Sequence, residues 1–134
     1  MSKVAVIGSA AWQNKRKVQE TLHGLKNRFG LDLVVIGAGG IEGANYMVKK
    51  YSIEFGIEYK EFNPSFTGSN LYSAMPESYY GKSYHFSQLH HRMKLIAQQC
   101  EYMIILTSES ALDPVLKTAY SNVKKLAKPV VILG

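Results

Sequence analysis

Long apolar segments are missing from this chain of 134 residues. The longest apolar runs, such as Val4 to Ile7 and Met103 to Leu106, have the length of strands, whereas a membrane-spanning helix needs about 20 apolar residues. The first residues lead directly into the first of these runs, without the apolar core and small-residue cleavage site of a secretory signal. We therefore expect a cytoplasmic protein with no membrane partner.

Cysteine is nearly absent, which limits disulfide and metal chemistry. The one cysteine, Cys100, cannot form an internal disulfide, and its place between a predicted helix and an apolar strand indicates a buried structural thiol. His85, His90 and His91 are close in sequence, but their spacing does not put all of them on one helix face, and no cysteine or acidic residue lies at ligand spacing. The sequence predicts no metal site, although proton transfer by a histidine stays open.

Acidic residues are also few, 10 against 16 lysines and arginines, so the formal charge is +6. The basic residues fall mostly on predicted helix faces opposite the apolar stripe, a position typical of solvated surface. Alternatively, the positive charge attracts phosphorylated ligands or nucleic acid. The main contributors are Lys15, Arg16, Lys17, Lys26, Arg28, Lys49, Lys50, Lys117, Lys124, Lys125 and Lys128.

Apolar periodicity predicts strands and helices in alternation from end to end. Near-continuous apolar strands separated by helices are typical of a parallel sheet buried on both faces, and right-handed crossovers favour the strand order 3-2-1-4-5. We therefore predict a single domain, an α/β Rossmann-like three-layer sandwich with a parallel sheet of about five strands. The expected strands are Lys3 to Ile7, Leu33 to Ile36, Glu58 to Phe62, Tyr102 to Leu106 and Val130 to Leu133, and the expected helices run from about Asn14 to Phe29, Ile41 to Phe55, Phe86 to Gln99 and Pro114 to Leu126.

In such a sheet, ligands bind beyond the carboxyl ends of the strands, near the switch between the first and fourth strands. Residues 8–13, 37–43 and 107–113 form loops at this edge. A longer segment, about 63–84, has neither period and exceeds an ordinary connection, which favours a lid or a binding element. Its aromatic side chains suit either base stacking or packing onto the domain body; they are Phe66, Tyr72, Tyr79, Tyr80 and Tyr84.

The strongest functional signal is the glycine-rich segment that runs from Gly37 to Gly43, between an apolar strand and a helix. Glycine backbone approaches a ligand closely, and the N–H groups at the start of a helix favour an anion. The segment is loosely similar to a dinucleotide fingerprint, and Glu61 lies at about the distance expected for a contact with a ribose hydroxyl. This pattern predicts phosphate or ribose binding more than a reaction.

Single residues in the neighbouring loops allow two interpretations each. Ser9 is suited either to a phosphate contact or to capping a turn, and Trp12 either to base stacking or to plugging the top of the sheet. Asp113 precedes a proline and is expected to cap a helix. Glu42 and Glu109 are weak candidates for catalysis, with Ser108 as an alternative contact beside Glu109.

Several segments together resemble the SLOG superfamily, which includes the DprA recombination mediators and the LOG phosphoribohydrolases, and most closely its small YspA-like branch of uncharacterised proteins. Residues 6–12, Val-Ile-Gly-Ser-Ala-Ala-Trp, are similar to the opening strand and Gly-Ser-Arg-Asp-Trp turn of that branch. Residues 39–45, Gly-Gly-Ile-Glu-Gly-Ala-Asn, are similar to its Gly-Gly-Ala-x-Gly-Ala-Asp motif. Tyr80-Gly81-Lys82, followed by a helix with Arg92-Met93, resembles its Gly-Lys segment and Arg-Asn-x-x-Met helix.

The resemblance implies a pocket for a nucleotide or a nucleotide-derived ligand, commonly in a homo-oligomer. The branch usually has Arg and Asp where Ala10 and Ala11 stand, and the enzymatic Pro-Gly-Gly-x-Gly-Thr loop is absent, so binding is favoured over hydrolysis. A nucleotide phosphoribohydrolase or N-glycosidase and a DprA-like DNA-binding protein are the alternatives. We expect no required cofactor, a nucleotide, NAD or ADP-ribose-like ligand as partner, and nucleic acid as a less favoured one. The predicted ligand-binding residues are Gly8, Ser9, Ala10, Trp12, Gly39, Gly40, Gly43, Asn45, Lys82, Arg92, Thr107 and Ser108.

Overall fold

One parallel sheet forms the centre of the molecule. The computed structural model describes residues 2–38, 43–62, 86–108 and 112–134. The strands follow the order β3-β2-β1-β4-β5, and every neighbouring pair is parallel, so the predicted Rossmann-like α/β fold and strand order are confirmed. The strands are β1 (Ser2–Gly8), β2 (Leu33–Gly37), β3 (Glu58–Glu61), β4 (Tyr102–Leu106) and β5 (Val130–Leu133).

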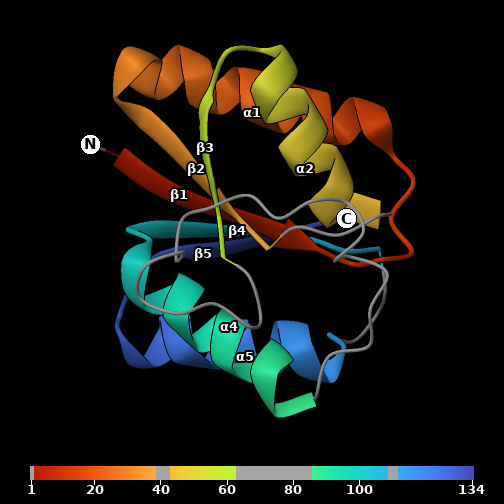
Figure 1. Ribbon diagram of the computed structural model, residues 1–134, viewed down its shortest axis with the longest axis vertical. Coiled ribbons are helices and arrows are strands. Elements are labelled where there is room, and N and C mark those ends of the chain that lie inside the picture. Colours follow the sequence, from red (N-terminus) through yellow and green to blue (C-terminus); the bar gives the residue numbers. More distant parts are fainter. Residues whose placement is uncertain (1, 39–42, 63–85, 109–111) are drawn as a thin grey trace.

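Helices cover both faces of this sheet (Figure 1). On one face lie α1 (Lys15–Phe29) and α2 (Gly43–Glu54), and on the other lie α4 (Phe86–Gln99) and α5 (Pro114–Lys125). The short 3-10 helix η1 (Gly30–Asp32) joins α1 to β2. The bounds of α4, β4 and β5 agree with those predicted, whereas α1 begins one residue later than predicted because Asn14 is its cap.

Two side-chain caps explain where α1 and α5 begin. The Asn14 side chain accepts a hydrogen bond from the Lys17 N–H (3.1 Å), and Asp113 Oδ1 accepts one from the Leu116 N–H (2.9 Å). Each bond satisfies an N–H group that the first turn of a helix leaves without an internal partner. The predicted capping role of Asp113, with Pro114 at the first helical position, is confirmed.

The core divides into two layers, one on each side of the sheet. In β1, Val4 and Val6 belong to the cluster packed against α1 and α2, whereas Ala5 and Ile7 belong to the cluster packed against α4 and α5. This alternation follows from the two-residue period of a strand. Cys100 lies in the second layer and is 1% exposed, which confirms a buried thiol, and burial raises the pKa of this thiol.

No helix in the described ranges is long and apolar enough to cross a membrane. Within the same ranges, the histidine, cysteine and acidic side chains form no group of three or more that would suit a metal ion. The predicted long loop at about 63–84 lies outside the described residues, so its bounds and its two interpretations stay predictions.

Candidate functional site at the carboxyl edge of the sheet

The end of β1 is fastened to the first turn of α2 by one side chain. Asn45 Oδ1 accepts a hydrogen bond from the Gly8 N–H (3.1 Å), and Asn45 Nδ2 donates one to the Gly8 carbonyl oxygen (3.2 Å). A Cβ atom on Gly8 would lie 2.4 Å from the Leu106 carbonyl oxygen and 2.6 Å from the Ala44 Cβ. Glycine is therefore required at this position by close packing, and the Asn45 amide holds the backbone in register.

The turn after β1 packs directly on the start of α2. The Ser9 carbonyl oxygen accepts hydrogen bonds from the Ala44 N–H (3.0 Å) and the Trp12 N–H (3.3 Å). Gly43 has φ +76°, and a Cβ there would lie 2.5 Å from the Ala10 carbonyl oxygen. Both the left-handed backbone and the close contact favour glycine at residue 43. The glycine-rich segment thus ends in a tight junction between two backbones.

The Ser9 hydroxyl lies inside this junction. Ser9 is 4% exposed, and its Oγ accepts a hydrogen bond from the Ala11 N–H (3.1 Å). This bond is the turn-closing contact that a serine side chain commonly makes with its own backbone. Of the two interpretations of Ser9, the described contacts match the turn cap.

One arginine reaches the same edge from the other helical layer. Arg92 extends from α4, and its Nη1 donates a hydrogen bond to the Ala38 carbonyl oxygen (2.6 Å). Ala38 follows β2 and immediately precedes the glycine-rich residues. The guanidinium thus carries a full positive charge to the edge of the sheet at which parallel α/β proteins bind ligands.

These elements surround a cavity of about 280 Å³. It lies where β1, α2, α4 and the start of α5 meet, beside the switch between β1 and β4 that the sequence predicts as the ligand site. Four of the predicted ligand-binding residues line it together: Gly8, Ala10, Asn45 and Arg92. The other lining residues are Leu89, Met93, Asp113, Pro114, Val115 and Leu116.

The charges around the cavity are of two kinds. Arg92 offers a cation, whereas Asp113 offers a carboxylate whose Oδ1 already accepts the Leu116 N–H. A guanidinium suits a phosphate or carboxylate group, and a carboxylate suits a hydroxyl or amino donor. Apolar side chains complete the wall, an arrangement typical of small-molecule sites. The cavity is therefore suited to a ligand that combines an anionic group with hydrogen-bond donors.

Other predicted residues lie nearby but outside this cavity. Trp12 is 3% exposed, and its Nε1 donates a hydrogen bond to the Asn14 carbonyl oxygen (3.0 Å), so the described contacts match the plug interpretation of the indole. Trp12 and the exposed Ser108 line a second hollow of about 300 Å³. Thr107 is 3% exposed, and its N–H donates to the Leu133 carbonyl oxygen (3.0 Å).

The predicted site also includes residues outside the described ranges. These are the ligand-binding candidates Gly39, Gly40 and Lys82 and the catalytic candidates Glu42 and Glu109. Their roles stay predictions.

Glu61, predicted to contact a ribose, is enclosed by protein. It ends β3 with 1% exposure, and its Oε1 accepts a hydrogen bond from the Tyr59 hydroxyl (3.2 Å) and lies 3.8 Å from Lys49 Nζ. The Tyr59 ring lies over Gly37, where a Cβ would be 2.5 Å from the hydroxyl oxygen. The described contacts of Glu61 are therefore those of a buried carboxylate that pairs with Tyr59 and Lys49.

Sequence reasoning placed Asp113 in a loop at this edge and expected it to cap a helix, and the cap is real. It did not place Leu89 and Met93 at the cavity. The available signal was positional, because α5 begins directly after the loop that follows β4, the strand beside the switch.

Comparisons with known proteins show a shared fold but no closer relationship. No protein-family model matches the chain, and no curated protein matches its sequence. DNA processing protein A from Helicobacter pylori, studied for its single-stranded DNA binding mode, is similar in structure, with a TM-score of 0.71 and 14% identity over 99% of this chain. This chain spans 65% of the length of that protein chain.

The molybdenum cofactor carrier protein from Chlamydomonas reinhardtii is also similar in two structures. Their TM-scores are 0.64 and 0.57, with 16% and 15% identity over 100% and 99% of this chain, and the match covers 78% and 76% of the respective carrier chains. At these identities the likeness shows a shared Rossmann-like architecture.

Proposed function

We propose that this chain binds a nucleotide or a nucleotide-derived anionic metabolite at the carboxyl edge of its sheet, as a sensor or sequestering protein that needs no cofactor. The observation that carries the proposal is the cavity of about 280 Å³ beside the β1/β4 switch, which Arg92 and Asp113 both line. A phosphate near Arg92 and a ribose hydroxyl or base amino group near Asp113 would use both charges.

The structure neighbours support a binding role in general terms. One is named for carrying a cofactor and another was studied for its binding of single-stranded DNA. We propose on this basis, and on the sequence motifs, that the chain is a SLOG-type protein of the DprA/LOG-like group, with the YspA-like branch and a homo-oligomeric, cytoplasmic state as further expectations.

Native mass spectrometry of the purified protein tests the proposal first, because it reports copurified small molecules and subunit number together. Isothermal titration calorimetry against nucleotides, NAD, ADP-ribose and cyclic dinucleotides then measures affinity. We expect at least one of these compounds to bind. No binding to any of them at millimolar concentration would contradict the proposal, and release of free base from a nucleotide would favour hydrolysis instead.

Arg92 provides the variant that locates the site. We expect Arg92→Ala to weaken ligand binding by about tenfold or more, because a charge-assisted hydrogen bond contributes roughly 1.5–3 kcal/mol. Arg92→Lys should retain part of the affinity, since the charge stays while the planar fork is lost. Arg28→Ala is the matched control, since Arg28 is exposed in the last turn of α1, and it should bind the ligand as the unchanged protein does. Equal losses for Arg92→Ala and Arg28→Ala would place the ligand elsewhere.

A further inference from the structure

Asp113 caps α5 and at the same time lines the cavity at the carboxyl edge. Its Oδ1 accepts a hydrogen bond from the Leu116 N–H (2.9 Å). An ionised carboxylate has about four acceptor positions on its two oxygens, and the cap occupies one of them. The remaining acceptor positions of Asp113 can therefore receive a donor from a ligand in the cavity.

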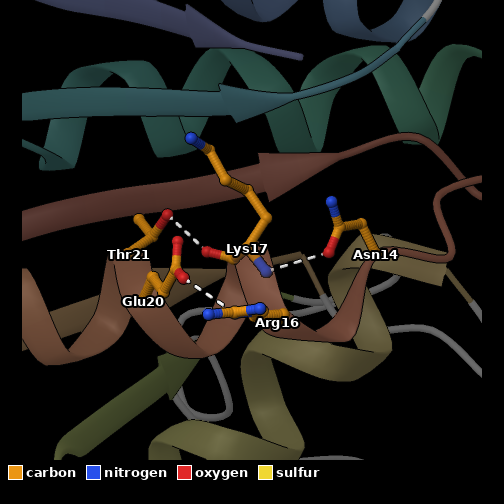
Figure 2. Close-up of polar contacts among 5 residues, drawn as sticks. All are labelled: Asn14, Arg16, Lys17, Glu20 and Thr21. Atoms are coloured by element: carbon orange, nitrogen blue, oxygen red, sulfur yellow. Dashed lines mark hydrogen bonds and ion pairs between the residues drawn. The ribbon is translucent and has the colours of Figure 1, made fainter.

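The start of α1 shows that such a cap does not require a carboxylate. Figure 2 shows Asn14 in the equivalent place, where its Oδ1 accepts a hydrogen bond from the Lys17 N–H (3.1 Å). In both helices the bond joins the capping side chain to the N–H of the third residue that follows. Asparagine and aspartate are about equally favourable as caps. The negative charge of Asp113 is therefore more than the start of the helix needs.

Arg92 and Asp113 bring opposite charges to one cavity without pairing with each other. Within residues 2–38, 43–62, 86–108 and 112–134, no cation lies within ion-pair distance of the Asp113 carboxylate. Arg92 Nη1 instead donates to the Ala38 carbonyl oxygen. The two side chains therefore suit two different groups of one ligand, an anion at Arg92 and a hydrogen-bond donor at Asp113.

The wall of the cavity beside Asp113 is apolar. Leu89 and Val115 are half-buried there, Pro114 is exposed, and Met93 of the core completes this wall. They come from α4 and α5, which pack together on one face of the sheet (Figure 1). Apolar side chains suit the flat face of a base, whereas ribose hydroxyls lose hydrogen bonds in apolar surroundings. The donor that meets Asp113 is thus expected on a base.

The size of the cavity suits one base. Its volume of about 280 Å³ lies at the lower end of the roughly 300–1,000 Å³ that is typical of small-molecule pockets. A ligand with one nucleotide unit therefore matches this cavity better than a ligand that must bury two.

We infer that Asp113 selects nucleotides whose base carries an exocyclic amino group, such as adenine or cytosine, over bases with a carbonyl oxygen at that position, such as hypoxanthine or uracil. The inference rests on the proposed function and names the class of base that the site takes. An amino group donates a hydrogen bond to the carboxylate, whereas a carbonyl oxygen brings a second acceptor against it. A site built to hydrogen-bond one group rejects an analogue that leaves its polar atoms without partners.

Isothermal titration calorimetry with AMP, IMP, CMP and UMP tests the inference. AMP differs from IMP, and CMP from UMP, by an amino group in place of a carbonyl oxygen. We expect AMP to bind about tenfold or more tightly than IMP, and CMP than UMP, because the lost hydrogen bond involves a charged group. Arg92→Ala should weaken all four by a similar factor, since they share the phosphate.

The outcomes separate this inference from the proposed function. Equal affinities within both pairs would overturn the inference and leave nucleotide binding in place. Binding of none of the four would also overturn it, and the titrations with NAD, ADP-ribose and cyclic dinucleotides would then decide the proposed function by themselves.

Asp113→Asn separates base selection from capping. Asparagine keeps the cap, as Asn14 does in α1, so circular dichroism and Tm should stay close to those of the unchanged protein. Its amide offers both a donor and an acceptor, so the affinity ratio within each pair should fall to about one. Asp113→Ser, with another good capping residue, should lower the ratio as well.

The matched control removes the same charge far from the cavity. Asp32→Asn alters an exposed carboxylate in η1, just before β2 begins, and should keep the affinity ratios of the unchanged protein. Ratios that persist in Asp113→Asn, or that Asp32→Asn lowers equally, would overturn the inference.

Discussion

The cavity at the carboxyl edge and a groove between α1 and α2 lie on either side of the start of α2, yet they are built in different ways. The groove is lined by Lys15, Gly43, Tyr46, Met47, Lys50 and Tyr51. The cavity wall is set by backbone contacts and by paired hydrogen bonds such as those between Asn45 and Gly8. At the groove, Lys15, Tyr46 and Lys50 are exposed, whereas Met47 is half-buried and Tyr51 is buried. A small ligand needs preorganised geometry, which the hydrogen bonds of the cavity wall provide.

Gly8→Ala should have the largest effect on stability, because Gly8 lies in the tightly packed wall of the cavity. The added Cβ would lie 2.4 Å from the Leu106 carbonyl oxygen and 2.6 Å from the Ala44 Cβ, neither of which moves easily. We expect the free energy of unfolding to fall by about 3 kcal/mol or more, measured by urea denaturation. Gly24→Ala is the control, since nothing lies within 4 Å of that position in α1, and it should raise stability by about 0.5–1 kcal/mol. Similar small effects for both variants would show that the wall is not tightly packed.

Asn45→Ala should have the next largest effect. It removes the partner of both the Gly8 N–H and the Gly8 carbonyl oxygen, and we expect a loss of about 2 kcal/mol in the same denaturation experiment. Asn27→Ala, at an exposed position of α1, should change stability by less than about 0.5 kcal/mol. An unchanged free energy of unfolding for Asn45→Ala would mean that water replaces the amide at both backbone groups.

Lysine side chains near the C-terminal ends of α4 and α2 extend the comparison between the cavity and the groove. Lys128 Nζ donates to the Ala97 and Gln98 carbonyl oxygens near the end of α4, which belongs to the cavity wall (2.9 and 2.8 Å). Lys26 Nζ donates to the Phe55 carbonyl oxygen just after α2 (2.6 Å) at an exposed position. We expect thermal unfolding to show a loss of about 1 kcal/mol for Lys128→Met and less than about 0.5 kcal/mol for Lys26→Met, because solvent weakens the exposed bond. A larger loss of stability for Lys26→Met than for Lys128→Met would contradict this expectation.

Lys15→Glu should produce a small change in stability, in the opposite direction to the losses above. An anion at the positive end of α1 is favourable, so we expect the free energy of unfolding, measured by urea denaturation, to rise by about 0.5 kcal/mol. Arg28→Glu places an anion at the negative end of the same helix dipole and should lower the free energy of unfolding by about the same amount. If Lys15→Glu lowered the free energy of unfolding, Lys15 would stabilise the fold through contacts that outweigh the helix dipole.

The fold was predictable because its signals are local and repeated. The apolar runs of the strands and the Asp113-Pro114 helix start each have a direct physical meaning, and the structure agrees with them. The strand order also follows from crossover handedness, a rule that applies to the whole class of parallel sheets.

The candidate site was predictable only in position. The switch between β1 and β4 fixes which loops meet, and Gly8, Ala10, Asn45 and Arg92 do meet there. The sequence does not show which partner each polar side chain binds through hydrogen bonds. Asn45 binds the Gly8 backbone, the Ser9 hydroxyl closes its own turn, and Glu61 pairs with Tyr59 and Lys49. These choices depend on distances across the fold, which a spacing pattern does not contain.

Trp12 has a practical consequence that follows from its position. It is the one tryptophan in the chain, and it lines the hollow at the carboxyl edge together with Ser108. Only 3% of Trp12 is exposed, and its Nε1 donates a hydrogen bond to the Asn14 carbonyl oxygen. Intrinsic emission excited at long ultraviolet wavelength therefore originates from a single indole in an apolar setting. The protein carries its own optical reporter at the edge of the sheet where ligands are expected, and no label is needed to follow events there.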